Sequence, residues 1–188
     1  MTHARVRIRA ASVEDLPSIV GILNHTAANS TASFDSEPTT VAARRDWFEQ
    51  FTSSGPYRCL VAQSDDQVVG YACSQRYRDH DAFRMTVEVS VGLDASCRGR
   101  GIGSQLYENL FALLDRAPVH VALAGIAVPN DASVALHRKF GFAEVGTFRE
   151  YAVKNGRYLS SVWMQRLFDV SPGTAARRPN PTWAPGPR

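Results

Sequence analysis

A segment rich in glycine and arginine is the part of the chain whose residue types point most directly to ligand chemistry. It reads Arg98-Gly99-Arg100-Gly101-Ile102-Gly103-Ser104. Glycines at alternate positions let the backbone adopt positive φ angles and approach a ligand closely, so that several N–H groups can point at one anion. The two arginines add positive charge. The segment therefore predicts a pyrophosphate-binding loop.

The sequence on either side of this loop supports that interpretation. A β-rich run over 86–93 precedes it, and an amphipathic helix is expected to begin near Gln105. The apolar stripe of that helix consists of Leu106, Leu110, Leu113 and Leu114. A helix that begins directly after the loop would direct the positive end of its dipole at a bound anion.

Two common phosphate-binding patterns fit the loop poorly. The dinucleotide fingerprint requires Gly-x-Gly-x-x-Gly, whereas this chain has Gly99-x-Gly101-x-Gly103. A P-loop requires a lysine followed by serine or threonine, and this loop contains no lysine. A nicotinamide oxidoreductase and a P-loop nucleotide hydrolase are both disfavoured, and a plain glycine-rich turn with two solvated arginines remains the simple alternative.

Composition limits the classes of protein to consider. The chain has 188 residues, of which 44% are hydrophobic and 21% charged, as expected for one well-packed domain. The net charge of +3 gives little support for a nucleic-acid partner. No apolar run approaches the roughly 18–20 residues that span a membrane, and no signal-peptide core is evident. Cys59, Cys73 and Cys97 form no Cys-x-x-Cys pair, which favours a reducing, cytoplasmic location.

The order of the predicted elements indicates an α/β (α+β) domain over 1–168. Strands are expected over 6–9, 57–63, 68–75, 86–93, 119–127, 142–148 and 161–168. Four helices are expected. The first follows a cap formed by Ser12 and Asp15, the second covers 41–51, the third begins near Gln105, and the fourth covers 132–140. This order predicts a central mixed, mostly antiparallel sheet with helices on both faces. The proline-rich segment 169–188 is expected to be a disordered tail.

The order and combination of several motifs resemble the GCN5-related N-acetyltransferase (GNAT) superfamily, and within it the phosphinothricin and methionine sulfoximine acetyltransferases. The motifs are Thr86-Val87-Glu88-Val89-Ser90-Val91, the glycine loop, Val128-Pro129-Asn130-Asp131-Ala132-Ser133-Val134 with His137, and Phe140-Gly141-Phe142. Asn24-His25, Phe34 and Glu37-Pro38 add to the likeness, which covers roughly residues 6–168. The resemblance implies the GNAT fold, acetyl-CoA as cosubstrate, an amine as acceptor, a homodimer, and no metal.

Two residues are candidates for the proton transfers that acetylation of an ammonium group requires. Glu88 lies on the strand before the loop and is the first candidate for the base that deprotonates the amine. His137 projects from the second turn of the helix that follows Asn130, and its near-neutral intrinsic pKa suits either base or acid. The simple alternatives are a surface glutamate and a packed helical histidine. Tyr107, on the helix after the loop, is expected to serve packing rather than chemistry.

The remaining cofactor contacts are expected from backbone groups. The resemblance implies that the backbone of Val91, Gly92 and Leu93 holds the pantetheine arm, with one N–H polarising the acetyl carbonyl. Asn130 is expected to contact the same arm and to cap the following helix, two roles that are compatible.

The acceptor site departs from the family pattern. Members typically carry an arginine and a tyrosine where this chain has His80 and Phe83, and a tyrosine where it has Gly92. Arg78 remains as a candidate anion contact and Phe34 as a candidate pocket wall, so that Phe34, Arg78, His80 and Phe83 form the predicted substrate-binding set.

The sequence thus predicts an N-acetyltransferase for a small amino-acid-like amine, with direct attack and no covalent enzyme intermediate. Two alternatives remain open: an enzyme that acetylates a protein or peptide amine, and a non-catalytic acetyl-CoA-binding module that regulates a partner.

Overall fold

The computed structural model describes residues 6–169. The strands are β1 (Arg7–Ala10), β2 (Arg58–Ser64), β3 (Gln67–Arg76), β4 (Thr86–Leu93), β5 (Val121–Val128), β6 (Ala143–Lys154) and β7 (Arg157–Leu167). The α-helices are α1 (Leu16–Asn29), α2 (Arg45–Glu49), α3 (Ile102–Leu114) and α4 (Asp131–Lys139). The order of elements matches the prediction. The tail expected over 169–188 lies outside the described residues apart from Asp169.

The strands form a single sheet whose order is β1-β2-β3-β4-β5-β7-β6. The pairing of β4 with β5 is parallel, and every other pairing between strands of the described residues is antiparallel. The sheet is therefore mixed and mostly antiparallel, as predicted.

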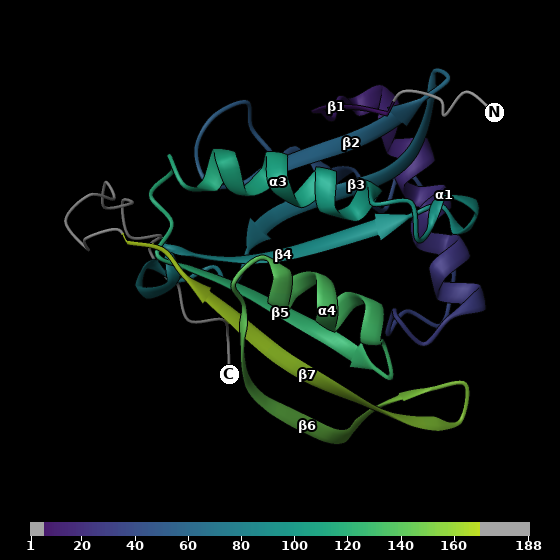
Figure 1. Cartoon of the computed structure of the whole chain (residues 1–188). Coiled ribbons are helices and arrows are strands. Elements are labelled where there is room, and N and C mark those ends of the chain that lie inside the picture. The colour runs from purple at the N-terminus through teal and green to yellow at the C-terminus, as the bar shows by residue number, and fades with distance from the viewer. Residues whose placement is uncertain (1–5, 170–188) are drawn as a thin grey trace, which may run out of the picture.

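Helices cover both faces of the sheet, with α3 and α4 on one face and α1 on the other (Figure 1). The alternation of side chains along β2 explains this division, because successive residues of a strand point to opposite faces. Leu60 and Ala62 belong to the core beneath α3, whereas Cys59 and Val61 belong to the core beneath α1. Helix α3 contributes the buried stripe that the sequence predicts, including Leu106, Leu110 and Leu114. None of the helices within the described residues is long and apolar enough to span a membrane.

The first helix begins with the expected capping arrangement. The carboxylate of Asp15 accepts a hydrogen bond from the backbone N–H of Ser12 at 2.8 Å and is also paired with Arg9. The α-helix proper starts at Leu16, so that Pro17 falls in its first turn, where the missing N–H would have no partner in any case.

The largest corrections concern the bounds of four elements. Helix α2 spans Arg45–Glu49 rather than 41–51, and α3 begins at Ile102 rather than near Gln105. Strands β6 and β7 are much longer than predicted and meet at a turn formed by Asn155 and Gly156, both with positive φ.

Candidate active site

The sheet opens at the point where β4 and β5 stop pairing. Their parallel register comprises Thr86 with Val121, Val87 with Ala122 and Glu88 with Leu123. Both strands continue beyond these pairs, β4 to Leu93 and β5 to Val128, but they are no longer paired with each other there. Backbone N–H and C=O groups on the facing edges are therefore available to a ligand, because each buried polar group needs a partner.

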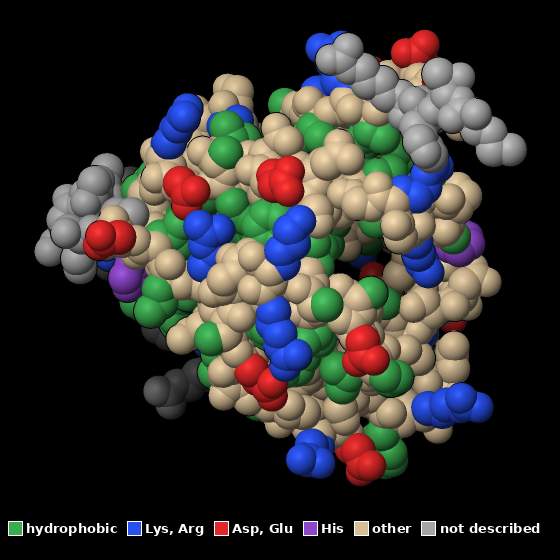
Figure 2. All heavy atoms as spheres, viewed as in Figure 1, with side chains coloured by type: hydrophobic (Ala, Val, Ile, Leu, Met, Phe, Trp, Pro, Cys, Tyr) green, Lys and Arg blue, Asp and Glu red, His purple; other side chains and the backbone are tan. Residues whose placement is uncertain are grey.

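A cavity of about 690 Å³ occupies this opening. It is lined by the diverging parts of β4 and β5, by α1, by the segment before α2, by the glycine loop and by α4. Figure 2 shows a hollow on this face of the molecule, between the ends of β4 and α4 and beside α1. Its volume lies in the range of small-molecule and cofactor sites.

The glycine loop takes the conformation that the sequence suggested. Gly99 and Gly101 have φ angles of 72° and 76°, in the left-handed region that glycine adopts at least cost. Gly101 is the N-cap of α3 and provides no side-chain hydrogen bond, so no side chain caps the N–H groups of the first turn. Arg98 and Gly99 line the cavity. An uncapped helix N-terminus beside an arginine suits a pyrophosphate.

The second helix at this edge is capped by its own sequence. The side-chain oxygen of Asn130 accepts a hydrogen bond from the N–H of Ser133 at 3.2 Å, and Asn130 also lines the cavity. The capping role is confirmed, and the amide nitrogen of Asn130 is left for other contacts.

Glu88 lies on the cavity wall at the last residue pair before the strands diverge. Its side chain is half-buried, and this burial raises the pKa of its carboxyl group, while a hydrogen bond from Gln75 on β3 acts in the opposite direction. A carboxylate with a raised pKa is a better proton acceptor for an ammonium group than an exposed one.

His137 also lines the cavity, but both of its ring nitrogens are already hydrogen-bonded. Nδ1 lies 2.7 Å from the carbonyl oxygen of Ser133, which can only accept, so Nδ1 carries the proton. Nε2 then accepts from the hydroxyl of Tyr107 at 2.9 Å. The imidazole is 3% exposed, and burial lowers its pKa, so the ring is neutral at neutral pH. Tyr107 is fully buried, and it therefore has a hydrogen-bonding role in addition to the packing role that the sequence suggested.

The structure brings most of the predicted residues to the cavity. Those that line it are Phe34, Glu88, Val91, Gly92, Leu93, Arg98, Gly99, Gly103, Asn130 and His137. Arg100, Gly101, Ile102 and Ser104 belong to the loop and the first turn of α3 without lining the cavity.

Three predicted acceptor-site residues lie away from the cavity. A 3₁₀ turn over Asp81–Phe83 folds this segment back on itself, with the ring nitrogen Nδ1 of His80 accepting from the N–H of Ala82. The guanidinium carbon of Arg78 lies 5.1 Å from the ring centroid of Tyr77 and 5.5 Å from that of Phe83. Arg78, His80 and Phe83 are therefore packed against one another and are not among the residues that line the cavity.

Other parts of the cavity wall are formed by residues that the sequence motifs do not include. They are Ile22, Leu23, Asp35, Arg44, Trp47, Tyr71 and Gln75. They come from α1, from the segment leading into α2, from α2 itself and from β3, so no local motif unites them. Within residues 6–169, no three His, Cys, Asp or Glu side chains are grouped so as to hold a metal ion.

Comparison with known proteins agrees with this geometry. The model of the Acetyltransferase (GNAT) family matches residues 22–142. A phosphinothricin N-acetyltransferase of Streptomyces coelicolor is 42% identical over 165 residues, covering 87% of this chain and 96% of that protein. An L-methionine sulfoximine/L-methionine sulfone acetyltransferase of Pseudomonas paraeruginosa is 38% identical over 163 residues, covering 86% and 94%.

A solved structure extends the likeness to three dimensions. The phosphinothricin acetyltransferase of Sinorhizobium meliloti, determined in complex with acetyl-CoA, superposes with a TM-score of 0.82 at 30% identity, covering 92% of this chain and 93% of that one. Sequence, fold and the opening between β4 and β5 lead to one conclusion: the chain belongs to the acetyltransferase (GNAT) family.

Proposed function

We propose that this protein transfers the acetyl group of acetyl-CoA to the amine of a small amino-acid-like acceptor of the phosphinothricin or methionine sulfoximine type. The observation that carries the proposal is the position of Glu88, a half-buried carboxylate at the point where β4 and β5 separate. The names of the relatives from Streptomyces coelicolor and Pseudomonas paraeruginosa support the acceptor class.

The residues present fit acetyl-CoA, which supplies an acetyl thioester when bound. The uncapped first turn of α3 and the guanidinium of Arg98 would hold the pyrophosphate. The backbone of Val91, Gly92 and Leu93 would hold the pantetheine arm, since this edge of β4 has no strand partner. The side-chain amide of Asn130 lines the same cavity and would donate to the arm.

Glu88 acts as the general base in this proposal. The amine binds as an ammonium ion and must lose a proton before its lone pair can attack the thioester carbon. The half-buried carboxylate accepts that proton, directly or through a water molecule. Its hydrogen bond with Gln75 fixes its orientation on the cavity wall.

His137 acts as a positioning residue in the conformation described. In the neutral ring, the Nδ1–H group donates a hydrogen bond to the backbone carbonyl of Ser133. The lone pair of Nε2 accepts a hydrogen bond from the hydroxyl of Tyr107. The ring therefore ties α4 to α3 beside the cavity. These two helices begin at the cofactor loop and at Asn130, so the pair fixes the spacing between the two groups of cofactor contacts.

The test is release of free thiol by the purified protein with acetyl-CoA and three additions in parallel: L-phosphinothricin, L-methionine sulfoximine, and no acceptor. Release above the acceptor-free rate, abolished in Glu88→Gln, supports the proposal. Acetylation of peptide amines alone would favour a peptide acetyltransferase. Binding of acetyl-CoA without turnover on any amine, unchanged in Glu88→Gln, would favour a regulatory module.

We further propose that the protein is a homodimer. The hairpin of β6 and β7 supports this, because both faces of the edge strand β6 are open and large apolar side chains are exposed there. Val145, Phe148, Val153 and Tyr158 are 57–70% exposed. Sedimentation equilibrium should give twice the chain mass of 20.6 kDa, and Phe148→Glu with Tyr158→Glu should give a monomer. Val13→Glu, at another exposed apolar residue, is the control.

We also propose a cytoplasmic location. The three cysteines support it, since Cys59, Cys73 and Cys97 are buried free thiols. Cell fractionation followed by immunodetection tests this proposal, and recovery in a periplasmic or membrane fraction would contradict it.

A further inference from the structure

Arg44 is the cationic side chain at the acceptor end of the cavity. Among the described residues that line the cavity, the only cationic side chains are Arg44 and Arg98. Arg98 belongs to the cofactor loop, and the predicted anion contact Arg78 lies away from the cavity against Tyr77 and Phe83. An acceptor with a negative group therefore has Arg44 as its available counter-ion.

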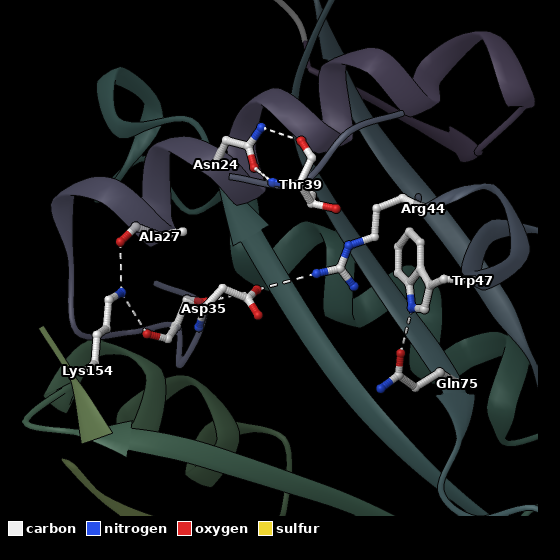
Figure 3. A network of polar contacts seen from close by, with 9 residues as sticks. Asn24, Ala27, Asp35, Thr39, Arg44, Trp47, Gln75 and Lys154 are labelled. Carbon is white, nitrogen blue, oxygen red and sulfur yellow. Dashed lines mark hydrogen bonds and ion pairs between the residues drawn. The ribbon is translucent and has the colours of Figure 1, made fainter. Parts of the chain in front are cut away.

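The position of Arg44 is fixed by its neighbours (Figure 3). The side chain of Asn24 on α1 makes two hydrogen bonds with the backbone of Thr39, at 2.9 and 2.8 Å, which hold the incoming segment against the helix. The backbone N–H of Arg44 donates to the carbonyl of Thr40 at 3.2 Å. Arg44 thus projects from an anchored turn rather than from a free loop.

The guanidinium itself retains hydrogen-bonding capacity. Nη2 donates to Asp35 at 3.3 Å, and the guanidinium carbon lies 6.0 Å from the ring centroid of Trp47. The single contact with Asp35 is long, and the carboxylate of Asp35 is half exposed. The other N–H groups of the guanidinium have no hydrogen-bond partner within residues 6–169, so they are available for a planar, two-pronged interaction with a carboxylate.

Tyr71 supplies a hydroxyl beside this arginine. Tyr71 is 5% exposed and lines the cavity, and its hydroxyl has no hydrogen-bond partner among residues 6–169. Tyr71 and Arg44 line the same cavity; burial raises the pKa of the phenol, and the charge of Arg44 acts on it in the opposite direction. The hydroxyl stays protonated at neutral pH and can donate to an anion.

The ring of Tyr71 also explains the glycine at position 92. A Cβ atom at Gly92 would lie 2.5 Å from Cε1 of Tyr71, which is closer than such atoms approach. Tyr71 and Gly92 are partners in the β3–β4 ladder, so the ring lies over the glycine of the neighbouring strand. A tyrosine at position 92, typical of the enzymes this chain resembles, is incompatible with this arrangement. The phenol reaches the cavity from β3 instead.

A chain of contacts connects this group to the proposed base. The indole N–H of Trp47 donates to the side-chain oxygen of Gln75 at 2.8 Å, and Gln75 is hydrogen-bonded to Glu88, its partner in the β3–β4 ladder. Arg44, Trp47, Gln75 and Glu88 therefore follow one another along a single wall of the cavity.

We propose that Arg44 and Tyr71 bind the α-carboxylate of the acceptor, in place of the arginine and tyrosines that this chain lacks at positions 80, 83 and 92. The protein then selects α-amino acids with a free carboxylate over the corresponding amides and simple amines. This inference rests on the proposed function, because it concerns the acceptor of the same reaction.

The test compares L-methionine sulfoximine with its α-carboxamide, since the carboxylate is the only anionic group of that acceptor. Kinetics are measured for the wild type, Arg44→Gln, Tyr71→Phe and the matched control Arg45→Gln, whose side chain is exposed and does not line the cavity. Arg44→Gln should raise the KM for the acid by about 10- to 100-fold, as expected for loss of a charged hydrogen-bonding partner. The KM for the carboxamide and for acetyl-CoA should stay within about twofold of the wild type, with Tyr71→Phe showing a smaller effect of the same kind.

The outcomes separate the two proposals. Equal changes for acid and carboxamide in Arg44→Gln, or no change for either, would overturn the carboxylate assignment while leaving the acetyltransferase intact. If the wild type neither acetylates L-methionine sulfoximine nor binds it calorimetrically in the presence of coenzyme A, both the acceptor class and the role of Arg44 are refuted. An unchanged KM for acetyl-CoA and an unchanged melting temperature show that the variant is folded.

Discussion

Lys154 joins the β6–β7 hairpin to the end of α1, and its replacement should loosen the acceptor side of the cavity. The residue is 6% exposed, and its ammonium group donates to the carbonyl oxygens of Ala27, Ser30 and Ser33 at 2.7, 2.8 and 2.9 Å. Figure 3 shows the side chain reaching the end of α1. Ala27 lies in the last turn of α1 and Ser30 is its C-cap, so two of these carbonyls are acceptors at a helix C-terminus, where a cation is favourable; Ser33 lies in the segment that follows.

The expected effect of Lys154→Met follows from these contacts. A hydrogen bond from a charged group contributes about 1.5–3 kcal/mol, so three such bonds would contribute about 5–9 kcal/mol. Methionine avoids the cost of burying an ammonium ion, which is several kcal/mol. The net loss should be about 2–4 kcal/mol, and the melting temperature should fall by roughly 10 °C for a domain of this size.

The assay is urea unfolding together with acceptor kinetics. Lys139→Met is the matched control, because Lys139 is 56% exposed and lies 3.6 Å from an equally exposed Glu108. It should change the free energy of unfolding by less than about 1 kcal/mol. Lys154→Met should also raise the KM for the acceptor more than the KM for acetyl-CoA, since the clamped segment leads into Phe34 and Asp35. Stability equal to that of Lys139→Met, or equal changes in the two KM values, would refute the reasoning.

Three other substitutions test the site. Glu88→Gln should lower kcat/KM by about 10²- to 10⁴-fold at neutral pH, while the affinity for acetyl-CoA measured by calorimetry stays unchanged. Because burial raises the pKa of Glu88, the wild-type kcat/KM should rise with pH around a midpoint above the pKa of an exposed glutamate. A rise that persists in the variant would exclude Glu88 as the base. Tyr107→Phe and His137→Leu should each destabilise the protein by about 1–3 kcal/mol, because each leaves the other residue's buried polar group unpaired. A double-mutant cycle should give a coupling of about 1 kcal/mol, and additive losses would contradict the hydrogen bond. Gly92→Ala should cost about 1–3 kcal/mol through its clash with Tyr71 and should be largely relieved by adding Tyr71→Ala, whereas an unrelieved loss in thermal melts would point to another cause.

Local sequence signals predicted most of the fold, and their failures have physical causes. Strand β4 was predicted with its observed bounds, because its alternating apolar residues precede an obvious loop. The predicted bounds of the β6–β7 hairpin are too short because β6 is exposed along most of its length. With no buried face, its sequence lacks the alternation of apolar and polar residues that marks a strand. The dipeptide Asn155-Gly156, a strong hairpin signal, could have corrected this.

The glycine loop at the cavity could be found from the sequence, whereas the part of the cavity wall formed by α1, α2 and β3 could not. Most of the proposed cofactor contacts lie in one continuous segment, from the end of β4 through the glycine loop, so a single motif contains them. Asn130, at the start of α4, lies outside that segment. Arg44 immediately precedes α2, whereas Tyr71 and Gln75 lie on β3, so these residues meet only when the chain folds. Likewise, the contact between Tyr107 and His137 joins residues 30 positions apart on different helices, and no spacing rule predicts it.

One feature of the topology accounts for the location of both halves of the site. Because β4 and β5 are parallel, their carboxyl ends meet at one edge of the sheet, and the helix that follows each strand begins there (Figure 1). Two helix N-termini thus face one opening, which favours a ligand with negative charge. The parallel ladder ends at Glu88, so the backbone edges beyond it are left for a ligand, and the carboxylate stands where that exposed edge begins. Extending the ladder past Glu88 would remove the open backbone edges and fill the space beside its carboxylate, so the proposed cofactor contacts and the proposed base both depend on where this pairing stops.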